Sequence, residues 1–355
     1  MSSTLEAVSG PVAMERPASS ERWRWLRLLF RRKIALIGAV LVTINVVVAV
    51  LAPAIGRWDP LLLDVKARLA APTATHWFGT DDVGRDVWSR VIYGARLSMI
   101  VGVSVVLFSF VAGIVFGLLG GYYRRFDNVL MRVMDGIMAF PGIILAIALM
   151  ASLGPSVVNV IVALGIVYVP RVARIVRGSV LVIRETPYVE AALALGAGDA
   201  TVLWKHILPN CLSPVIVQGT FIFAAAVLGE AALSFLGVGV PPQIPSWGNV
   251  LAEGRLYLQQ APWLTLFPGA AIMACILGLN LFGDGLRDLL DPKLRGVTGA
   301  ARGGESGGAG AGRRGRQRSR WALIGARRRL GVRLGGRRLG RPRYPPVLGS
   351  LPPRR

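Results

Sequence analysis

Long runs without a charged residue dominate the middle of the chain. A bilayer core of about 30 Å requires roughly 20 apolar helical residues per crossing, because backbone amides in hydrocarbon must be hydrogen-bonded within their own segment. Runs of this size recur, and Gly154-Pro155 divides the longest one into two. The pattern predicts an all-α protein with six transmembrane helices, over 34–56, 97–123, the two halves of 136–170, 207–237 and 256–283.

The composition agrees with a membrane protein. The 355 residues are 53% hydrophobic and 17% charged, with a mean hydropathy of +0.54, which argues against a soluble globular enzyme. The first apolar run follows basic residues and ends near Ala52-Pro53-Ala54, as in a signal peptide. It is longer than the roughly 7 to 15 residues of a signal-peptide core, so an uncleaved anchor is favoured.

The net charge of +22 is concentrated in the C-terminal tail. Residues 297–355 hold 16 Arg and one acid, Glu305, without apolar periodicity, which predicts a disordered tail and no nucleic-acid partner. A dispensable arm or translation past a shifted reading frame is favoured over adhesion to anionic lipid headgroups. The chain therefore divides into a cytoplasmic arm (1–33), a six-helix transmembrane domain (34–296) and the tail (297–355).

Basic residues near the span ends set the orientation in the membrane. They precede the first span and fill the second-to-third and fourth-to-fifth connections, which places these segments and both termini in the cytoplasm. The 154–156 turn and the 238–263 loop hold only Arg255 as a basic residue and lie outside. The cytoplasmic basic residues are Arg22, Arg24, Arg27, Arg31, Arg32, Lys33, Arg124, Arg125, Arg132, Arg171, Arg174, Arg177, Arg184 and Lys205.

Residues for catalysis or for metal and cofactor binding are scarce. No lysine follows a glycine, so the chain lacks the Gly-Lys-Ser/Thr loop that cradles ATP phosphates, and ATP-driven work must come from another polypeptide. His76 and His206 are assigned to opposite sides of the membrane, which supports neither a metal site nor a catalytic triad. The acids at 81, 82 and 86 lack calcium-loop spacing and are expected to be turn and helix-start residues.

Two features inside the spans carry specific expectations. Glu230 lies within the fifth span, where a charge costs about 2.5 to 3.5 kcal/mol, so it is either a pathway or gate residue facing a water-filled cavity or a group that holds two helices together. Gly113, Gly117 and Gly121 recur every four residues on one face of the second span. This spacing predicts a tight packing seam, within the chain or with a second membrane subunit.

The loop between the fourth and fifth spans, 186–209, predicts a short helix. Thr186-Pro187 can open it, Glu190 complements the dipole of its first turn, and Gly196 or Gly198 can end it. Ala191 and Ala192 give it a small, apolar face on the cytoplasmic side. Such a helix is shaped to dock into a groove of another protein.

These residues resemble the EAA loop of membrane subunits of bacterial ATP-binding-cassette importers. The match rests on Glu190-Ala191-Ala192, Gly196 and Leu208-Pro209. The runs 78–90, 93–98, 209–214 and 284–294 resemble the dipeptide/oligopeptide branch, in particular its C-type subunit, and His206 fits that branch. The resemblance covers about residues 22–295.

The resemblance implies a type I importer permease in the bacterial cytoplasmic (inner) membrane, with no catalytic residues or cofactor of its own. Its implied partners are a homologous second permease subunit, two ATPase subunits and an extracytoplasmic solute-binding protein. The EAA loop would transmit the energy of ATP hydrolysis, while the first outside loop and 238–263 would receive the binding protein. Permeases of the related nickel and glutathione importers look similar in sequence, so one of these importers is an alternative to a peptide importer. A proton-coupled secondary transporter using Glu230 and a purely structural membrane scaffold are the alternatives of other classes.

Overall fold

The computed structural model describes residues 33–290, and the arm before Lys33 and the 297–355 tail lie outside this part of the chain. The described part is helical, with no extended strand. Its elements are α2 (Lys33–Val50), α3 (Ala52–Ile55), η2 (Val65–Ala67), α4 (Val87–Tyr122), α5 (Arg124–Met138), α6 (Gly142–Leu153), α7 (Val157–Ile183), α8 (Pro187–Ala194), α9 (Asp199–Thr201), η3 (Val202–Ile207), α10 (Leu208–Phe235), α11 (Trp247–Gly254), η4 (Arg255–Tyr257) and α12 (Trp263–Leu290).

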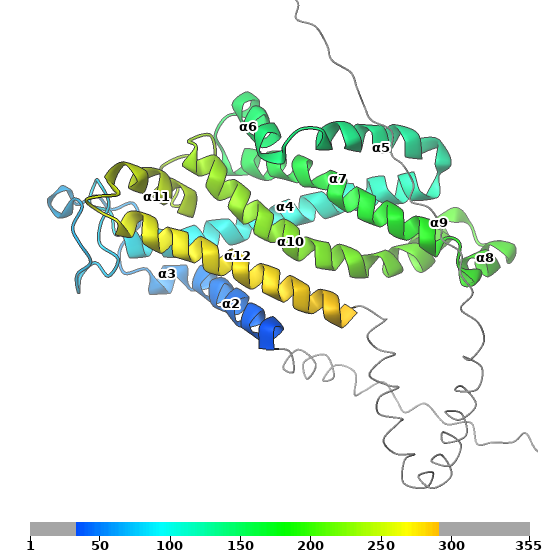
Figure 1. The fold of residues 1–355 in the computed structure, drawn as a ribbon, viewed down its shortest axis with the longest axis horizontal. Helices are drawn as coiled ribbons and strands as arrows, with labels where there is room; N and C mark the ends of the chain where they lie inside the picture. Colours follow the sequence, from blue (N-terminus) through cyan, green and yellow to red (C-terminus); the bar gives the residue numbers. More distant parts are fainter. Residues whose placement is uncertain (1–32, 291–355) are drawn as a thin grey trace, which may run out of the picture. The chain divides into compact units, whose positions relative to one another are not determined.

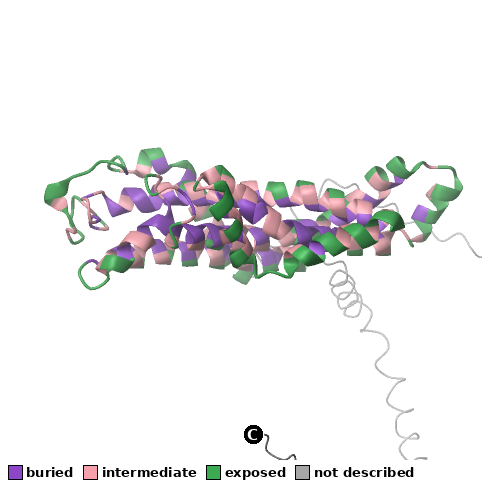
Figure 2. Ribbon diagram, turned by 90° about the horizontal axis from the view of Figure 1, so that it is seen from above, coloured by how far each residue is buried: buried purple, intermediate pink, exposed green. Residues whose placement is uncertain are grey.

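The long helices of residues 33–290 run side by side (Figure 1). α4 packs along α7, α10 contacts both, and α12 lies between α10 and α2. The loop 51–86 and α11 gather at one end of this bundle, and α8 and α9 at the other. Buried residues line the inner surfaces of these helices, whereas much of the outer surface is exposed (Figure 2). We refer to the two ends as the α11 end and the α8 end.

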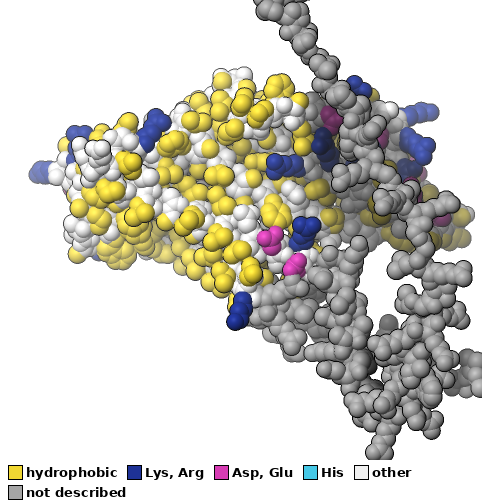
Figure 3. Space-filling view, viewed as in Figure 1, with side chains coloured by type: hydrophobic (Ala, Val, Ile, Leu, Met, Phe, Trp, Pro, Cys, Tyr) yellow, Lys and Arg dark blue, Asp and Glu magenta, His cyan; other side chains and the backbone are white. Residues whose placement is uncertain are grey.

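Apolar side chains face outward as well as inward. On the face shown in Figure 3, hydrophobic side chains cover most of the surface between the two ends. Exposed apolar side chains of the described helices include Ile37 and Ile44 of α2, Val111 of α4 and Met273 of α12, each about half exposed or more. A helix that is apolar all round needs an apolar surrounding, and lipid supplies it.

The prediction of membrane-spanning helices is confirmed. Within residues 33–290, five helices are long and apolar enough to cross a bilayer, namely α2, α4, α7, the 199–235 stretch ending in α10, and α12. The α5–α6 pair makes a sixth span if it is counted as one, although its two helices meet at 90°. The predicted division at Gly154-Pro155 is also found, because α6 ends at Leu153 and Gly154 adopts φ 83°.

Some span boundaries differ from the predicted ones. The fourth span does not stop at Pro170: α7 continues to Ile183, since a buried proline is tolerated inside a membrane helix when neighbours satisfy the backbone. The predicted third span, 136–153, shortens to the 12 residues of α6, because Pro141 interrupts the run. α4 begins at Val87 rather than Leu97, capped by the Asp86 carboxylate, which accepts a hydrogen bond from the Ser89 amide.

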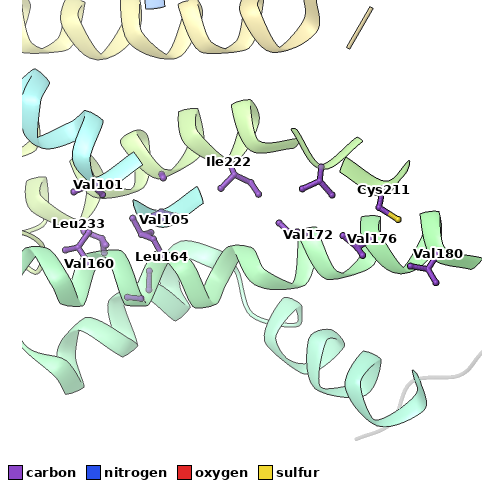
Figure 4. Close-up of a cluster of buried hydrophobic side chains, with 14 of the residues drawn as sticks. Val101, Val105, Val160, Leu164, Val172, Val176, Val180, Cys211, Ile222 and Leu233 are labelled. Carbon is purple, nitrogen blue, oxygen red and sulfur yellow. The ribbon is translucent and has the colours of Figure 1, made fainter. Parts of the chain in front are cut away.

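The glycine series of α4 lies against α7. A methyl group built on Gly113, Gly117 or Gly121 would lie 2.5, 2.6 or 2.7 Å from the Cβ atom of Val172, Val176 or Val180, respectively. These valines are fully buried and form one row of the larger apolar core between α7 and α10 (Figure 4). The seam therefore joins two helices of this chain, and it depends on the backbones approaching closely.

We expect Gly117→Val to destabilise the protein strongly. Its side chain would meet both Val176 and the Ala173 carbonyl oxygen, which lies 2.7 Å from the added carbon, and backbone cannot move aside cheaply. Overpacking of this kind costs about 1 to 3 kcal/mol or more. Thermal unfolding of the detergent-purified protein should show a lowered midpoint. Gly178→Val on α7, where nothing lies within 4 Å, is the matched control and should leave the midpoint near wild type.

Candidate functional site

The short helix α8 starts at a proline and ends in a hydrogen-bonded glycine turn. It begins at Pro187 after Thr186 and places Glu190 in its first turn. At its other end Gly196 takes φ 85°, with its amide bonded to the Leu193 carbonyl and the Ala197 amide to the Ala192 carbonyl. This pair of hydrogen bonds is a Schellman motif, which requires a residue in the left-handed conformation at the turn. Glycine is the residue that adopts this conformation without strain.

α8 is anchored on one side and exposed on the other. Val189 is fully buried and belongs to the core between α7 and α10, as do Val202 and Ile207 of η3. The opposite side is exposed and carries Glu190, Ala191, Gly196 and Leu195, of which Leu195 is 89% exposed. Ala192 is half-buried. Leu193 of α8 and Trp204 of η3 are exposed as well, so this end of the bundle carries several exposed apolar side chains.

Hydrogen bonds tie the α8 segment to two long helices. The Tyr122 and Tyr123 hydroxyls, at the end of α4, donate to the Asp199 carboxylate at 2.8 and 3.3 Å. The Asn210 amide, beside Pro209 at the start of α10, donates to the Tyr188 hydroxyl at 3.2 Å. Leu208 and Pro209 are the first residues of α10 and follow the π-helical turn η3 without a break. These hydrogen bonds connect α9 with the end of α4 and connect α8 with the start of α10.

Glu230 is fully buried in this conformation. Its carboxylate accepts hydrogen bonds from Ser98 of α4 at 3.4 Å and from Ser234 of α10 at 2.9 Å. The Ser234 oxygen in turn accepts the amide of Val240 in the loop before α11. Within residues 33–290 no Lys or Arg forms an ion pair with Glu230. The arrangement joins α4, α10 and the α10–α11 loop.

The α11 end contains an ion-pair network that the sequence did not suggest. Arg90 is 1% exposed and donates to the carboxylates of both Asp81 and Glu253, and Arg85 pairs with the same two acids at 2.6 and 3.0 Å. Glu253 lies 163 residues from Arg90 in the sequence, so spacing could not reveal this partner, whereas Asp81 and Arg85 form an i,i+4 pair. Trp247 adds a second tie, donating its indole N–H to the Val91 carbonyl at 2.8 Å.

Asp81, Asp82 and Glu253 bring carboxylate oxygens within 4.8 Å of one another, as in a cation site. The guanidinium groups of Arg85 and Arg90 already form ion pairs with two of these three acids, Asp81 and Glu253. Burial, followed by the neighbouring charges of Asp81 and Glu253, raises the pKa of Asp82 above its ordinary value. Asp81 also accepts the amides of Val83 and Arg85, and Asp86 caps α4, so these acids act as the expected turn and helix-start residues.

A hollow opens beside the α5–α6 break. It has a volume of about 570 Å³ and is lined by apolar residues of the break, α7 and α10, with Tyr168 and Arg171 of α7 as the polar groups. Next to it, α5 is fastened to α7 by two ion pairs. Asp127 binds Arg177 at 2.5 and 2.7 Å, and Asp135 binds Arg174 at 2.5 Å.

The fold and these sites define a multi-pass membrane protein with a short, partly exposed helix at one end. Residues 113–296 match the family described as binding-protein-dependent transport system inner membrane component. The chain is 52% identical over 269 residues to a putative peptide transport system permease protein of Brucella suis, covering 76% of this chain and 91% of that protein.

Two further relatives show the range of the family. The dipeptide transport system permease protein DppC of Alkalihalophilus pseudofirmus is 44% identical over 77% of this chain and 90% of its own length. The glutathione transport system permease protein GsiD of Pectobacterium atrosepticum is 40% identical over 77% of this chain and 92% of its own length. The chain belongs to this family of inner-membrane transport components. It is a multi-pass permease of the bacterial inner membrane, in a family that works with ATPase and binding-protein partners.

Proposed function

We propose that this chain is one of two homologous permease subunits of an ATP-dependent peptide importer. It would line the translocation pathway together with the second permease and be driven by two ATPase subunits. The observation that carries the proposal is α8, a helix held to the core by Val189 and exposed along its outer face. Peptides are the proposed cargo because the Brucella suis and Alkalihalophilus pseudofirmus relatives are named for peptide and dipeptide transport.

α8 would act as the coupling helix between the ATPase and the bundle. Glu190, Ala191, Ala192 and Gly196 would contact the ATPase, and the Tyr122–Asp199 and Asn210–Tyr188 hydrogen bonds would carry its movement into α4 and α10. Two-state packing of the bundle then converts a small displacement of α8 into opening or closing of the pathway. Leu208 and Pro209 would form the joint between the loop and α10.

The α11 end would receive the solute-binding protein. Its loop 51–86 exposes Leu61, Leu62 and Leu63, each about half exposed or more, and Arg57 stacks on the exposed Trp77 ring at 4.6 Å. Beneath this surface the Arg90–Glu253 ion pair and the Trp247–Val91 hydrogen bond hold the loop and α11 to the start of α4. A rigid outer surface of this kind suits repeated docking of a soluble partner.

Reconstitution tests the proposal directly. Proteoliposomes holding this chain, its second permease and both ATPases should accumulate alanyl-alanine when ATP is supplied inside and loaded binding protein outside. Omitting either the ATPases or the binding protein should stop accumulation. Uptake by this chain alone, driven by a proton gradient, would contradict the proposal and favour the secondary-transporter alternative.

Glu230 substitutions separate a structural tie from a proton carrier. We expect Glu230→Gln to keep most of the uptake, because the amide oxygen can still accept from Ser234 while the amide NH2 group donates to the Ser98 hydroxyl oxygen. Glu230→Ala should lower the unfolding midpoint and the yield, since it leaves a cavity and unpaired buried hydroxyls, at a cost of about 2 to 5 kcal/mol. Uptake and unfolding of both variants check this. Complete loss of uptake in a well-folded Glu230→Gln protein would argue for proton transfer.

A further inference from the structure

Three arginines follow one another along α7 at intervals of three residues. Arg171, Arg174 and Arg177 were assigned from the sequence to a cytoplasmic connection, but α7 runs uninterrupted to Ile183, so they lie on the helix itself. Residues three apart are neighbours on a helix surface. Arg171 lies roughly 20 Å along the axis from Val157, at a rise of about 1.5 Å per residue, which is within the thickness of a bilayer core.

Two of these arginines have an acidic partner and the third does not. Asp135 pairs with Arg174 and Asp127 with Arg177, both from α5. In the described range 33–290 no acid pairs with Arg171, whose guanidinium lies 5.6 Å from the centre of the Tyr168 ring. Arg171 is exposed, so its guanidinium is open to a counter-ion that the described part of the chain does not supply, and an ionisable residue within a membrane helix is a candidate functional position. Its counter-ion should therefore be an anionic ligand that binds and dissociates reversibly.

Arg171 lines the 570 Å³ hollow beside the α5–α6 break. The rest of the lining is apolar, including Leu164, Val167 and Leu228, and contains no acid. Tyr168 is held in place by donating its hydroxyl to the Ala225 carbonyl at 3.1 Å. A hollow of this volume is in the range of small-molecule sites, and one cation in an apolar lining selects an amphipathic anion.

We infer that this hollow is a transient binding site for the cargo, in which Arg171 binds the C-terminal carboxylate of a peptide and the apolar lining accepts its side chain. The inference rests on the proposed function and adds the group that is recognised inside the membrane. Arginine suits this role because its planar fork donates two parallel hydrogen bonds to a carboxylate. The site would assist passage of peptides that carry a free carboxyl end.

The test compares alanyl-alanine with its C-terminal amide in the reconstituted importer. Because the binding protein also contacts the peptide, uptake of each is measured with the binding protein loaded to the same occupancy. The wild-type importer should move the free acid about tenfold faster than the amide, the size expected for a charge-assisted hydrogen bond. Arg171→Gln should bring this ratio close to one by slowing the free acid alone, and Arg171→Lys should restore part of it.

Arg174→Gln is the matched control, because its arginine already has a partner and should not affect the ratio. An unchanged ratio in Arg171→Gln would overturn the inference. Equal slowing of both peptides, with loss of the second permease on purification, would overturn it by assigning the counter-ion to that subunit. Equal slowing that varies with anionic lipid content would overturn it in favour of a headgroup. Failure of the wild-type importer to move either peptide would overturn the proposed function, and this inference with it.

Discussion

Replacing Gly196 with aspartate is expected to abolish peptide uptake while the assembled importer continues to hydrolyse ATP. No described residue lies within 4 Å of the carbon that the substitution would add, so the side chain would project outward from the turn that ends α8. It would also strain the Schellman turn, where φ is 85°, by about 1 to 2 kcal/mol. Uptake and phosphate release, measured in the same proteoliposomes, report the two activities separately.

Glu190→Arg should have the same effect by a different route. Reversing the charge in the first turn of α8 opposes the helix dipole by only about 0.3 to 1 kcal/mol, too little to unfold the segment, so a loss of uptake would report contact with the ATPase. Gly198→Asp is the control for both variants. Its φ is −71° and it occupies the N-cap of α9, which aspartate suits. Wild-type uptake by Gly196→Asp and Glu190→Arg would contradict the coupling role.

Arg90→Met is expected to cause the largest loss of stability at the α11 end. Among the described residues it would leave the fully buried Asp81 with Arg85 as its one ion-pair partner, and it would release Glu253 from the start of α4. Breaking a buried ion pair from one side costs about 3 to 5 kcal/mol, because a buried charge loses its compensation. Thermal unfolding of the purified protein should show a clearly lower midpoint, together with poorer capture by immobilised binding protein.

The matched variant is Arg174→Met. Its ion pair with Asp135 has side chains that are 45% and 59% exposed, and exposed pairs contribute about 0 to 1 kcal/mol. The unfolding midpoint should therefore stay close to wild type. If Arg90→Met and Arg174→Met behaved alike, the outer network would not be what holds the loop, α11 and α4 together.

The sequence predicted the helices better than their ends. Apolar runs located the membrane-spanning helices because a span needs a fixed length of hydrocarbon-compatible residues. The predicted end of the fourth span at Pro170 was wrong because the span was ended at the first charged residue, Arg171. The sequence of this segment alone could not show that Arg174 and Arg177 pair with acids of α5. α4 begins ten residues earlier than Leu97 because Arg90 is neutralised by Asp81 and Glu253.

Local chemistry was readable at α8 and less so elsewhere. Thr186-Pro187 and Gly196 determine where a short helix starts and stops, and these signals depend only on neighbouring residues. The sequence left Glu230 between two roles, since its hydroxyl partners, Ser98 and Ser234, belong to different helices. The hollow at Arg171 depends on where α5 bends away from α6, which no local pattern specified.

The pairing of α2 with α12 has a consequence for how the protein is made. A methyl group at Gly278 of α12 would lie 2.8 Å from the Leu41 Cβ atom, so the first and last membrane helices touch closely. During synthesis α2 enters the bilayer first and lacks this packing partner until α12 has also been made and inserted. A message truncated before codon 263 would yield a protein in which α2 has no α12 to pack against. Such a product should be degraded by membrane proteases faster than the full chain.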